Sequence, residues 1–148
     1  MTLAAAAGAL LAFGEEFSRQ TFYSMLQRSG VEKVRICVSC QDAMITLNQS
    51  ARKWNLLLLD SRISRGLDTV REIRRRMGPH IKILMVFSGP TKEAVAEAIE
   101  AGVDDIMIYP VSQATLEKKL SRHVSLQQSK VTLFKRADRA ADVFTASQ

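Results

Sequence analysis

Short apolar runs alternate along the chain with longer segments whose apolar residues recur every three or four positions. We expect the short runs to be strands, which span Ala9 to Phe13, Val34 to Val38, Leu56 to Leu59, Ile81 to Phe87 and Asp105 to Ile108. Several of them are apolar at nearly every position, which indicates that both faces of the strand are buried. Such strands are typical of a parallel sheet covered by helices on both faces. The pattern therefore predicts an α/β protein.

Five helices are expected between and after these strands. They cover Phe17 to Arg28, Gln41 to Arg52, Leu67 to Met77, Thr91 to Ala101, and a segment from Ser112 to about Val124. The first, third and fourth are followed by Gly30, Gly78 and Gly102, which are suitable helix stops. The spacing in the fourth helix predicts an inward face made of Ala94, Val95, Ala98 and Ile99.

Strict alternation with right-handed crossovers predicts a doubly wound fold with a five-stranded parallel sheet. We take the strand order to be 2-1-3-4-5, the flavodoxin-like arrangement of such sheets. In such sheets the ligand site lies beyond the carboxyl ends of the strands, where the strand order reverses. Asp60 follows the third run and brings a carboxylate to this crevice. The other expected lining residues are Phe13, Gly14, Phe87, Ser88 and Tyr109.

Length and composition fit one folded domain. The chain has 148 residues, 47% of them hydrophobic and 24% charged, with a net charge of +6, which excludes a disordered or low-complexity chain. The apolar N-terminal stretch has no basic residue before it and is too short to span a membrane, so we expect neither a signal peptide nor a membrane segment. A cytoplasmic protein is the default expectation.

Much of the excess positive charge lies in two places. One is the end of the third helix, with Arg71, Arg74, Arg75 and Arg76, where we expect a solvated helix end. The other is the segment 125–148, which carries Lys130, Lys135, Arg136 and Arg139. We divide the chain into a domain at 1–124 and a basic tail at 125–148, helical or partly disordered, which is too short for a usual DNA-binding output domain.

Cys37 and Cys40 form a C-x-x-C motif, but they are not expected to form a redox pair or half a zinc site. Cys37 falls inside a strand, whereas a reactive thiol of this kind needs a helix N-terminus, and no second ligand pair has suitable spacing. Trp54, just before the third strand, is interpreted as a packing residue.

From Ala9 to about Val124 the sequence resembles a response-regulator receiver (CheY-like) domain. The matching pieces are Leu56 to Asp60, Ile83 to Val86, Ala101 to Val103, Tyr109-Pro110 and Ala114 to Glu117, in the family's order. The resemblance implies that Asp60 is the phosphoacceptor position. It also implies a partner surface on the fourth helix, fifth strand and fifth helix, here with Lys92, Glu97, Ile106, Tyr109, Gln113 and Lys118.

The sequence departs from the family pattern around Asp60. Phe13 and Gly14 stand where receivers have the acidic pair that holds Mg²⁺, and Phe87 replaces a hydroxyl residue, with Ser88 next to it. Tyr109 replaces the conserved lysine of the family pattern, and Ile106 occupies the position of an aromatic switch residue. With Asp60 alone, Mg²⁺ should bind weakly. Glu15 or Glu16 would restore a metal site only if the first helix shifted its register.

Arg62, two residues beyond Asp60, suggests a substitute: its guanidinium would fold back onto the carboxylate as a tethered cation. We therefore expect a stand-alone, degenerate pseudo-receiver in a phosphorelay that acts through protein contacts or as a homodimer, without enzymatic activity or cofactor. A conventional receiver phosphorylated on Asp60 by a histidine kinase, with Mg²⁺, is one alternative. A nucleic-acid-binding module that uses the basic tail is the other, and nucleic acid is the less favoured partner.

Overall fold

The structure is a computed structural model, and it describes residues 8–124. The strands are β1 (Gly8–Ala12), β2 (Lys33–Cys37), β3 (Leu56–Asp60), β4 (Lys82–Phe87) and β5 (Asp105–Ile108). The helices are α1 (Glu16–Arg28), α2 (Cys40–Ser50), α3 (Gly66–Met77), α4 (Lys92–Ala101) and α5 (Gln113–His123), with a short 3₁₀ helix η1 (Ala51–Lys53) after α2. The expectations for the tail at 125–148 lie outside the described residues.

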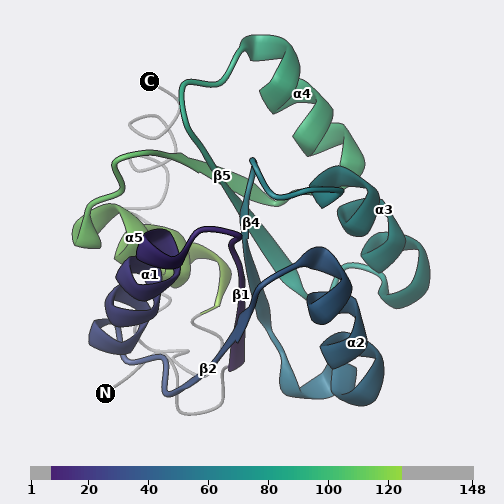
Figure 1. Cartoon of the computed structure of the whole chain (residues 1–148), viewed down its shortest axis with the longest axis horizontal. Coiled ribbons are helices and arrows are strands. Elements are labelled where there is room, and N and C mark those ends of the chain that lie inside the picture. The colour runs from purple at the N-terminus through teal and green to yellow at the C-terminus, as the bar shows by residue number, and fades with distance from the viewer. Residues whose placement is uncertain (1–7, 125–148) are drawn as a thin grey trace.

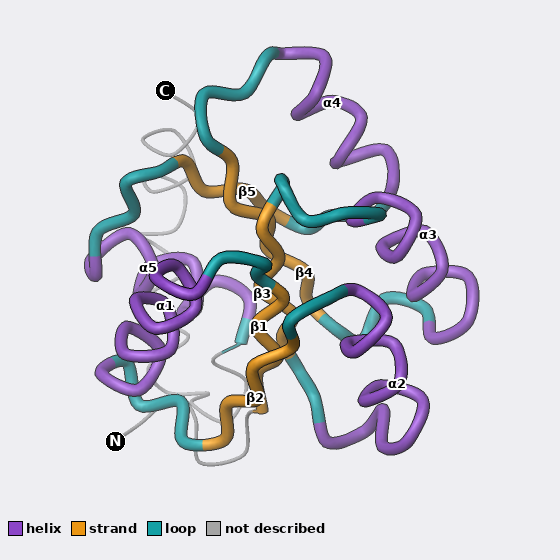
Figure 2. The backbone as a smooth tube through the Cα atoms, in the orientation of Figure 1, coloured by secondary structure: helices purple, strands orange, loops and turns teal. Residues whose placement is uncertain are grey.

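The five strands form one parallel sheet in the order β2-β1-β3-β4-β5, which confirms the predicted fold. Figure 2 shows the strands stacked in this order through the middle of the molecule. Helices α1 and α5 lie on one side of the sheet, and α2, α3 and α4 lie on the other (Figure 1). The strand order reverses between β1 and β3, which places the expected crevice at their carboxyl ends.

Two apolar layers hold the helices on the sheet. Successive residues of a strand point to opposite faces, so Leu57 belongs to the layer under α2, α3 and α4, whereas Leu58 belongs to the layer under α1 and α5. Both side chains are fully buried. The covering of both faces explains why β3 is apolar at each position before Asp60.

The helices begin and end at residues suited to those positions. Ser39, Thr91 and Ser112 cap α2, α4 and α5 by accepting hydrogen bonds from backbone N–H groups. Gly102 ends α4 with a φ of 122°, which an L side chain rarely adopts. A Cβ atom at Gly102 would also lie 2.6 Å from Cγ of Arg74, so this position requires glycine.

Element boundaries and two burial expectations need correction. The first and second strands begin and end one residue earlier than predicted, because the ladder is formed by backbone groups and includes Gly8 and Lys33. The third strand extends through Asp60, and the fourth begins one residue later than predicted, at Lys82. The second helix ends at Ser50 because residues 51–53 tighten into η1. Ile99, expected to face inward, is 49% exposed because Ala98 and Ala101 turn toward the sheet instead.

Val38 was included in the second strand, but it follows the last residue of β2 and is exposed in the turn before α2. The expected solvated end of α3 is also only partly correct. Arg74 turns inward and donates hydrogen bonds to the carbonyl oxygens of Gly102, Gly78 and Ile81, and to Asp104 at 2.7 Å. Within residues 8–124, no helix has the length and apolar character needed to cross a membrane.

Candidate functional site

Asp60 is the last residue of β3 and lies at the carboxyl edge of the sheet. Its register partner is Val86 in β4, and the N–H of Ser61 donates to the carbonyl of Val86 at 2.9 Å, which fixes the start of the following loop. Asp60 is only 3% exposed. A carboxylate this deeply buried requires a partner, because burial without one is costly.

That partner is Arg62. Its Nε donates to Oδ1 of Asp60 at 3.1 Å, its Nη2 donates to Oδ2 at 3.2 Å, and its backbone N–H donates to Oδ1 at 3.0 Å. The planar guanidinium therefore covers both carboxylate oxygens in a two-point contact. The hydrogen bond and charge of Asp60 raise the pKa of Arg62. The structure thus brings together the two residues that sequence spacing suggested as a pair.

Tyr109 forms the other side of this contact. Cζ of Arg62 lies 5.0 Å from the centroid of the Tyr109 ring, in the geometry of a cation–π interaction. The ring meets Phe22 of α1 edge to face at 5.9 Å, and Phe22 in turn packs against Phe13 at 4.9 Å. Burial raises the pKa of the Tyr109 hydroxyl. Tyr109 therefore gives Arg62 an aromatic surface to lie on.

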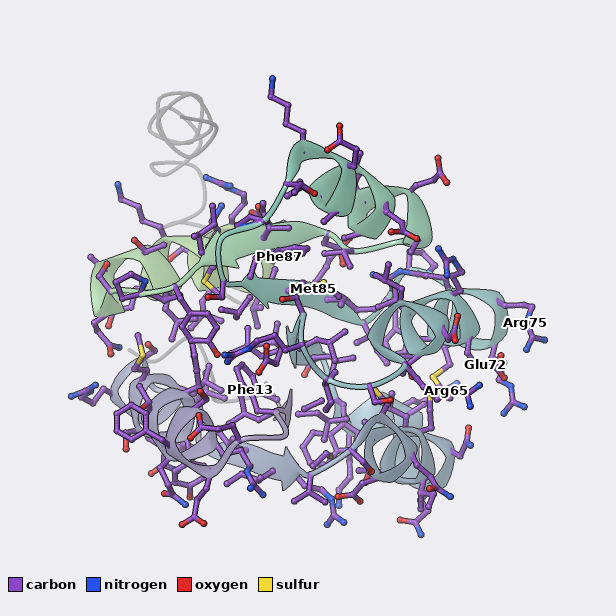
Figure 3. All side chains as sticks on the ribbon, turned by 45° about the horizontal axis from the view of Figure 1, so that its top comes forward. Phe13, Arg65, Glu72, Arg75, Met85 and Phe87 are labelled. Carbon is purple, nitrogen blue, oxygen red and sulfur yellow. The ribbon has the colours of Figure 1, made fainter. Side chains whose placement is uncertain are left out.

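Of the remaining predicted pocket residues, some contribute apolar surface near Asp60 and the others are exposed to solvent. Phe13 is fully buried after β1, and Phe87 ends β4 with 7% exposure; Figure 3 shows both side chains in the middle of the molecule. Gly14 and Ser88 are exposed. Ile106 is half-buried and packs against the core layer that faces α4. The surroundings of Asp60 therefore supply one cation, Arg62, and several aromatic rings.

Glu15 and Glu16 do not join Asp60. Glu15 caps α1: its carboxylate accepts hydrogen bonds from the hydroxyl of Ser18 at 2.7 Å and from the backbone N–H groups of Ser18 and Phe17 at 2.9 Å. These hydrogen bonds, that of the Ser18 hydroxyl first, lower the pKa of Glu15. Glu16 lies in the first turn of α1 and is exposed. The register shift that a metal site would need is therefore absent.

The residues around Asp60 do not fit Mg²⁺. Magnesium requires oxygen ligands in octahedral geometry and is usually held by one or two carboxylates. Both oxygens of Asp60 accept hydrogen bonds from Arg62, and the carboxylate of Glu15 is engaged by α1. No group of three His, Cys, Asp or Glu side chains within residues 8–124 could hold a metal ion.

The two cysteines are buried free thiols. Burial raises the pKa of Cys37 to about 11 and also raises the pKa of Cys40. Thiolates are the reactive form, so both side chains are inert at neutral pH, as expected for a C-x-x-C motif that begins inside a strand. Trp54 is 6% exposed and belongs to the core, which confirms its packing role.

Sequence reasoning missed a second buried ionic cluster. Asp105, the first residue of β5, is contacted at 3.0 Å by Lys119, Arg122 and His123 of α5. The spacing of these three residues places them on one helix face, and this was the available signal. Gln113, expected on the partner surface, is half-buried, and its amide N–H donates to Met25 O and Ser29 Oγ, so it also joins α5 to α1.

Comparison with known proteins identifies the family. Residues 13–121 match the response regulator receiver domain. The transcriptional regulatory protein ZraR of Salmonella typhimurium is 30% identical over 118 residues, which cover 76% of this chain and 26% of ZraR. CitT of Halalkalibacterium halodurans is 27% identical over 97 residues, which cover 64% of this chain and 42% of CitT. The match thus spans less than half of either relative.

Solved structures share the fold at lower identity. The chemotaxis protein CheY4 of Vibrio cholerae superposes with a TM-score of 0.72 at 21% identity, covering 80% of this chain and 99% of CheY4. NtrX of Brucella abortus gives a TM-score of 0.72 at 23% identity, covering 88% of this chain and 29% of NtrX. The parallel sheet, the position of Asp60 and the family match over residues 13–121 lead to one conclusion: this chain belongs to the response regulator receiver family of two-component signalling.

Proposed function

We propose that this domain is a degenerate receiver that acts through protein contacts, and that phosphorylation of Asp60 is impaired. The observation that carries the proposal is the two-point contact of Arg62 with both oxygens of Asp60. Receiver domains typically bind Mg²⁺ at their phosphorylation site, whereas here a tethered guanidinium neutralises the carboxylate. The domain would have no enzymatic activity and would need no cofactor.

The chemistry of phosphoryl transfer supports this proposal. An incoming phosphoryl group needs a free carboxylate oxygen in line with its leaving group, and cations that stabilise the charge developing on its other oxygens. Arg62 occupies the carboxylate oxygens, and Phe87 and Tyr109 stand where the family has a hydroxyl residue and a lysine. Transfer to Asp60 would therefore begin by breaking the contact with Arg62, and no metal would then assist it.

Phosphorylation with acetyl phosphate and Mg²⁺, followed by intact mass measurement, tests the proposal. We expect no phosphoryl adduct on the wild-type chain under conditions that label a conventional receiver run in parallel. Asp60→Asn is the matched control, because it removes the acceptor oxygen and keeps the shape. A phosphoryl adduct on the wild type that is absent in Asp60→Asn would show instead that this is a conventional receiver phosphorylated on Asp60.

The proposed contact surface lies on α4, β5 and α5. Ile99 of α4 and Ile108 of β5 are 49% and 51% exposed, and burial of such side chains favours association. We propose that this face meets a signalling protein or a second copy of the chain. Sedimentation of Ile108→Glu tests the homodimer, with Ile45→Glu on α2 as control because Ile45 is equally exposed, at 50%. Only Ile108→Glu should weaken self-association.

A further inference from the structure

The edge of the sheet opposite Asp60 carries positive charge, only part of which has an acidic partner. In a parallel sheet with helical crossovers, the strands begin and the preceding helices end at the same edge. This chain places cations in those helix ends and in the connections that follow them. We define the basic edge by the side chains in η1, at the end of α3 and at the starts of β2 and β4: Lys33, Arg52, Lys53, Arg75, Arg76 and Lys82.

Backbone contacts bring Lys33, Lys53 and Lys82 to one edge of the sheet, and Arg52 precedes Lys53 in η1. Lys33 begins β2 opposite Gly8, and Lys82 begins β4 opposite Leu56. Between them, Asn55 donates its N–H to the carbonyl of Gly8 and accepts from the N–H of Lys82, both at 2.9 Å. A Cβ atom on Gly8 would lie 2.4 Å from the carbonyl oxygen of Lys53, so Lys53 lies against the start of β1.

The row has a defined length. Lys33 and Lys82 begin strands that are separated by β1 and β3, and neighbouring strands lie about 4.8 Å apart, so their backbones are about 14 Å apart. This distance corresponds to about four base-pair steps of a DNA duplex, at 3.4 Å each. The basic edge thus offers a rigid row of cations on the scale of several consecutive phosphates.

The charge of the row is only partly neutralised. Lys33, Arg52 and Lys53 are exposed, and none of them forms an ion pair with an acidic side chain of residues 8–124. Arg75 and Arg76 share Glu72, and Figure 3 shows Glu72 and Arg75 at the outer side of α3. Asp104 and Asp105 are engaged by Arg74 and by α5. Glu32, next to Lys33, is another exposed acid at this edge. Glu32 and Glu72 together offset two of the six positive charges, so the row keeps a positive excess.

The absence of apolar anchors on the basic edge narrows the kind of partner. Across residues 8–124 the exposed large hydrophobic side chains are Phe17, Val38, Ile45, Ile99 and Ile108, and none belongs to the row. Protein interfaces rely on buried aromatic or apolar anchors, membrane-surface helices on an apolar face, and single-stranded nucleic acids on stacking against aromatic rings. Trp54, the nearest aromatic residue in sequence, is buried. A duplex phosphate backbone requires none of these features.

We propose that the basic edge binds the phosphate backbone of double-stranded nucleic acid without recognition of its sequence. This goes beyond the proposed receiver function, since it uses the opposite edge of the sheet. From the sequence, nucleic acid was the less favoured partner, and the tail cations were its expected contact. The fold adds what the sequence did not reveal, namely that Lys33, Arg52, Lys53 and Lys82, from distant parts of the chain, lie in one row.

Fluorescence anisotropy of a labelled mixed-sequence DNA duplex, titrated with the full chain, tests this inference. At about 50 mM salt we expect binding whose logarithmic dependence on salt has a slope of about −4, as for roughly four to five phosphate contacts. Arg52→Glu and Lys53→Glu should each weaken binding by about tenfold and reduce the slope by about one or more. Arg65→Glu is the matched control: it makes the same change of charge at an exposed residue where α3 begins, at the opposite edge of the sheet. We expect it to change binding by less than about twofold.

Four outcomes would overturn the inference, provided that far-UV circular dichroism shows each variant to be folded. The first is no binding at about 50 mM salt. The second is an equal loss of binding in Arg65→Glu, which would indicate that net charge alone drives binding. The third is binding that survives Lys53→Glu and Arg52→Glu but is lost when Lys130, Lys135, Arg136 and Arg139 are changed to Gln. The fourth is binding to phosphatidylserine vesicles without binding to the duplex.

Discussion

Two carboxylates, the buried Asp60 and the partly buried Asp105, lie at opposite edges of the sheet and contact their cationic partners in different ways. At the carboxyl edge, the side chain of Asp60 is 4% exposed and its one cationic partner, Arg62, is 54% exposed. At the opposite edge, the side chain of Asp105 is 17% exposed, and its partners Lys119, Arg122 and His123 are 8%, 16% and 15% exposed. The first contact is open to water, whereas the second is closed.

The difference has a structural origin. The partners of Asp105 come from one face of α5, so the packing of that helix on the sheet holds them in place. Burial opposes ionisation of Asp105, yet hydrogen bonds from His123 and Lys119 hold its pKa far below the usual range. Arg62, in contrast, belongs to the loop after β3 and rests on Tyr109. We infer that the Asp105 cluster stabilises the fold, whereas the contact between Arg62 and Asp60 can break without unfolding the domain.

The largest expected effect is the loss of Asp105. In Asp105→Asn the buried cations Lys119 and Arg122 face a neutral amide, and breaking a buried ionic cluster in this way costs about 3 to 5 kcal/mol. Asp60→Asn should cost less, about 1 to 2 kcal/mol, because Arg62 can turn to water. Urea unfolding followed by circular dichroism at pH 7 measures both. Equal losses would remove the distinction between the two edges.

The second-largest expected effect is a pH dependence of the stability that Asp105 provides. The pKa of Asp105 is lower in the folded state than in the unfolded chain. Its contribution to the free energy of unfolding is therefore fully present above the ordinary aspartate pKa, about 3.9. That contribution is lost as the pH falls toward the pKa of the folded state. The stability difference between wild type and Asp105→Asn should therefore narrow by on the order of 2 kcal/mol between about pH 5 and pH 2.

Urea unfolding at several pH values checks this narrowing. His123→Gln in both backgrounds is the control, because it replaces the imidazole that contacts Asp105 with a neutral amide. If the stability difference between Asp105 and Asp105→Asn stays constant with pH in these backgrounds, the side chain of Asp105 stabilises the fold through packing and not through its charge.

A double-mutant cycle measures the contact at the carboxyl edge. Arg62→Ala, Asp60→Asn and the double variant should give a coupling free energy of about 1 to 2 kcal/mol, because the two-point contact is strong but its arginine is half in water. The coupling should decrease with added salt. Arg62→Lys keeps the charge but not the planar fork, and should retain about half of the coupling. A coupling near zero would show that the guanidinium does not hold Asp60.

Much of the fold could be predicted from sequence because burial on both faces leaves a clear signal. The run from Leu56 to Leu59 is apolar at each position, and the glycines mark helix ends. Asp60 and Arg62 could be paired because they are two residues apart. The contact of Arg62 with Tyr109 and the Asp105 cluster could not be predicted in the same way, since each joins elements that meet only in three dimensions. Ile99 was misplaced because helical spacing allowed either it or Ala101 to face the sheet.

The smallest predicted effect concerns the ring beneath Arg62. A cation–π contact at a partly exposed site contributes about 0.5 to 1 kcal/mol, so Tyr109→Leu should lower the Arg62–Asp60 coupling by about that amount. Tyr109→Phe is the matched control, because it keeps the ring that the guanidinium covers and removes only the hydroxyl. If both variants lower the coupling equally, the hydroxyl rather than the ring supports Arg62. If neither variant lowers the coupling, Asp60 alone orients Arg62. The contacting rings of Tyr109, Phe22 and Phe13 would then contribute to core packing but not to the Arg62–Asp60 contact.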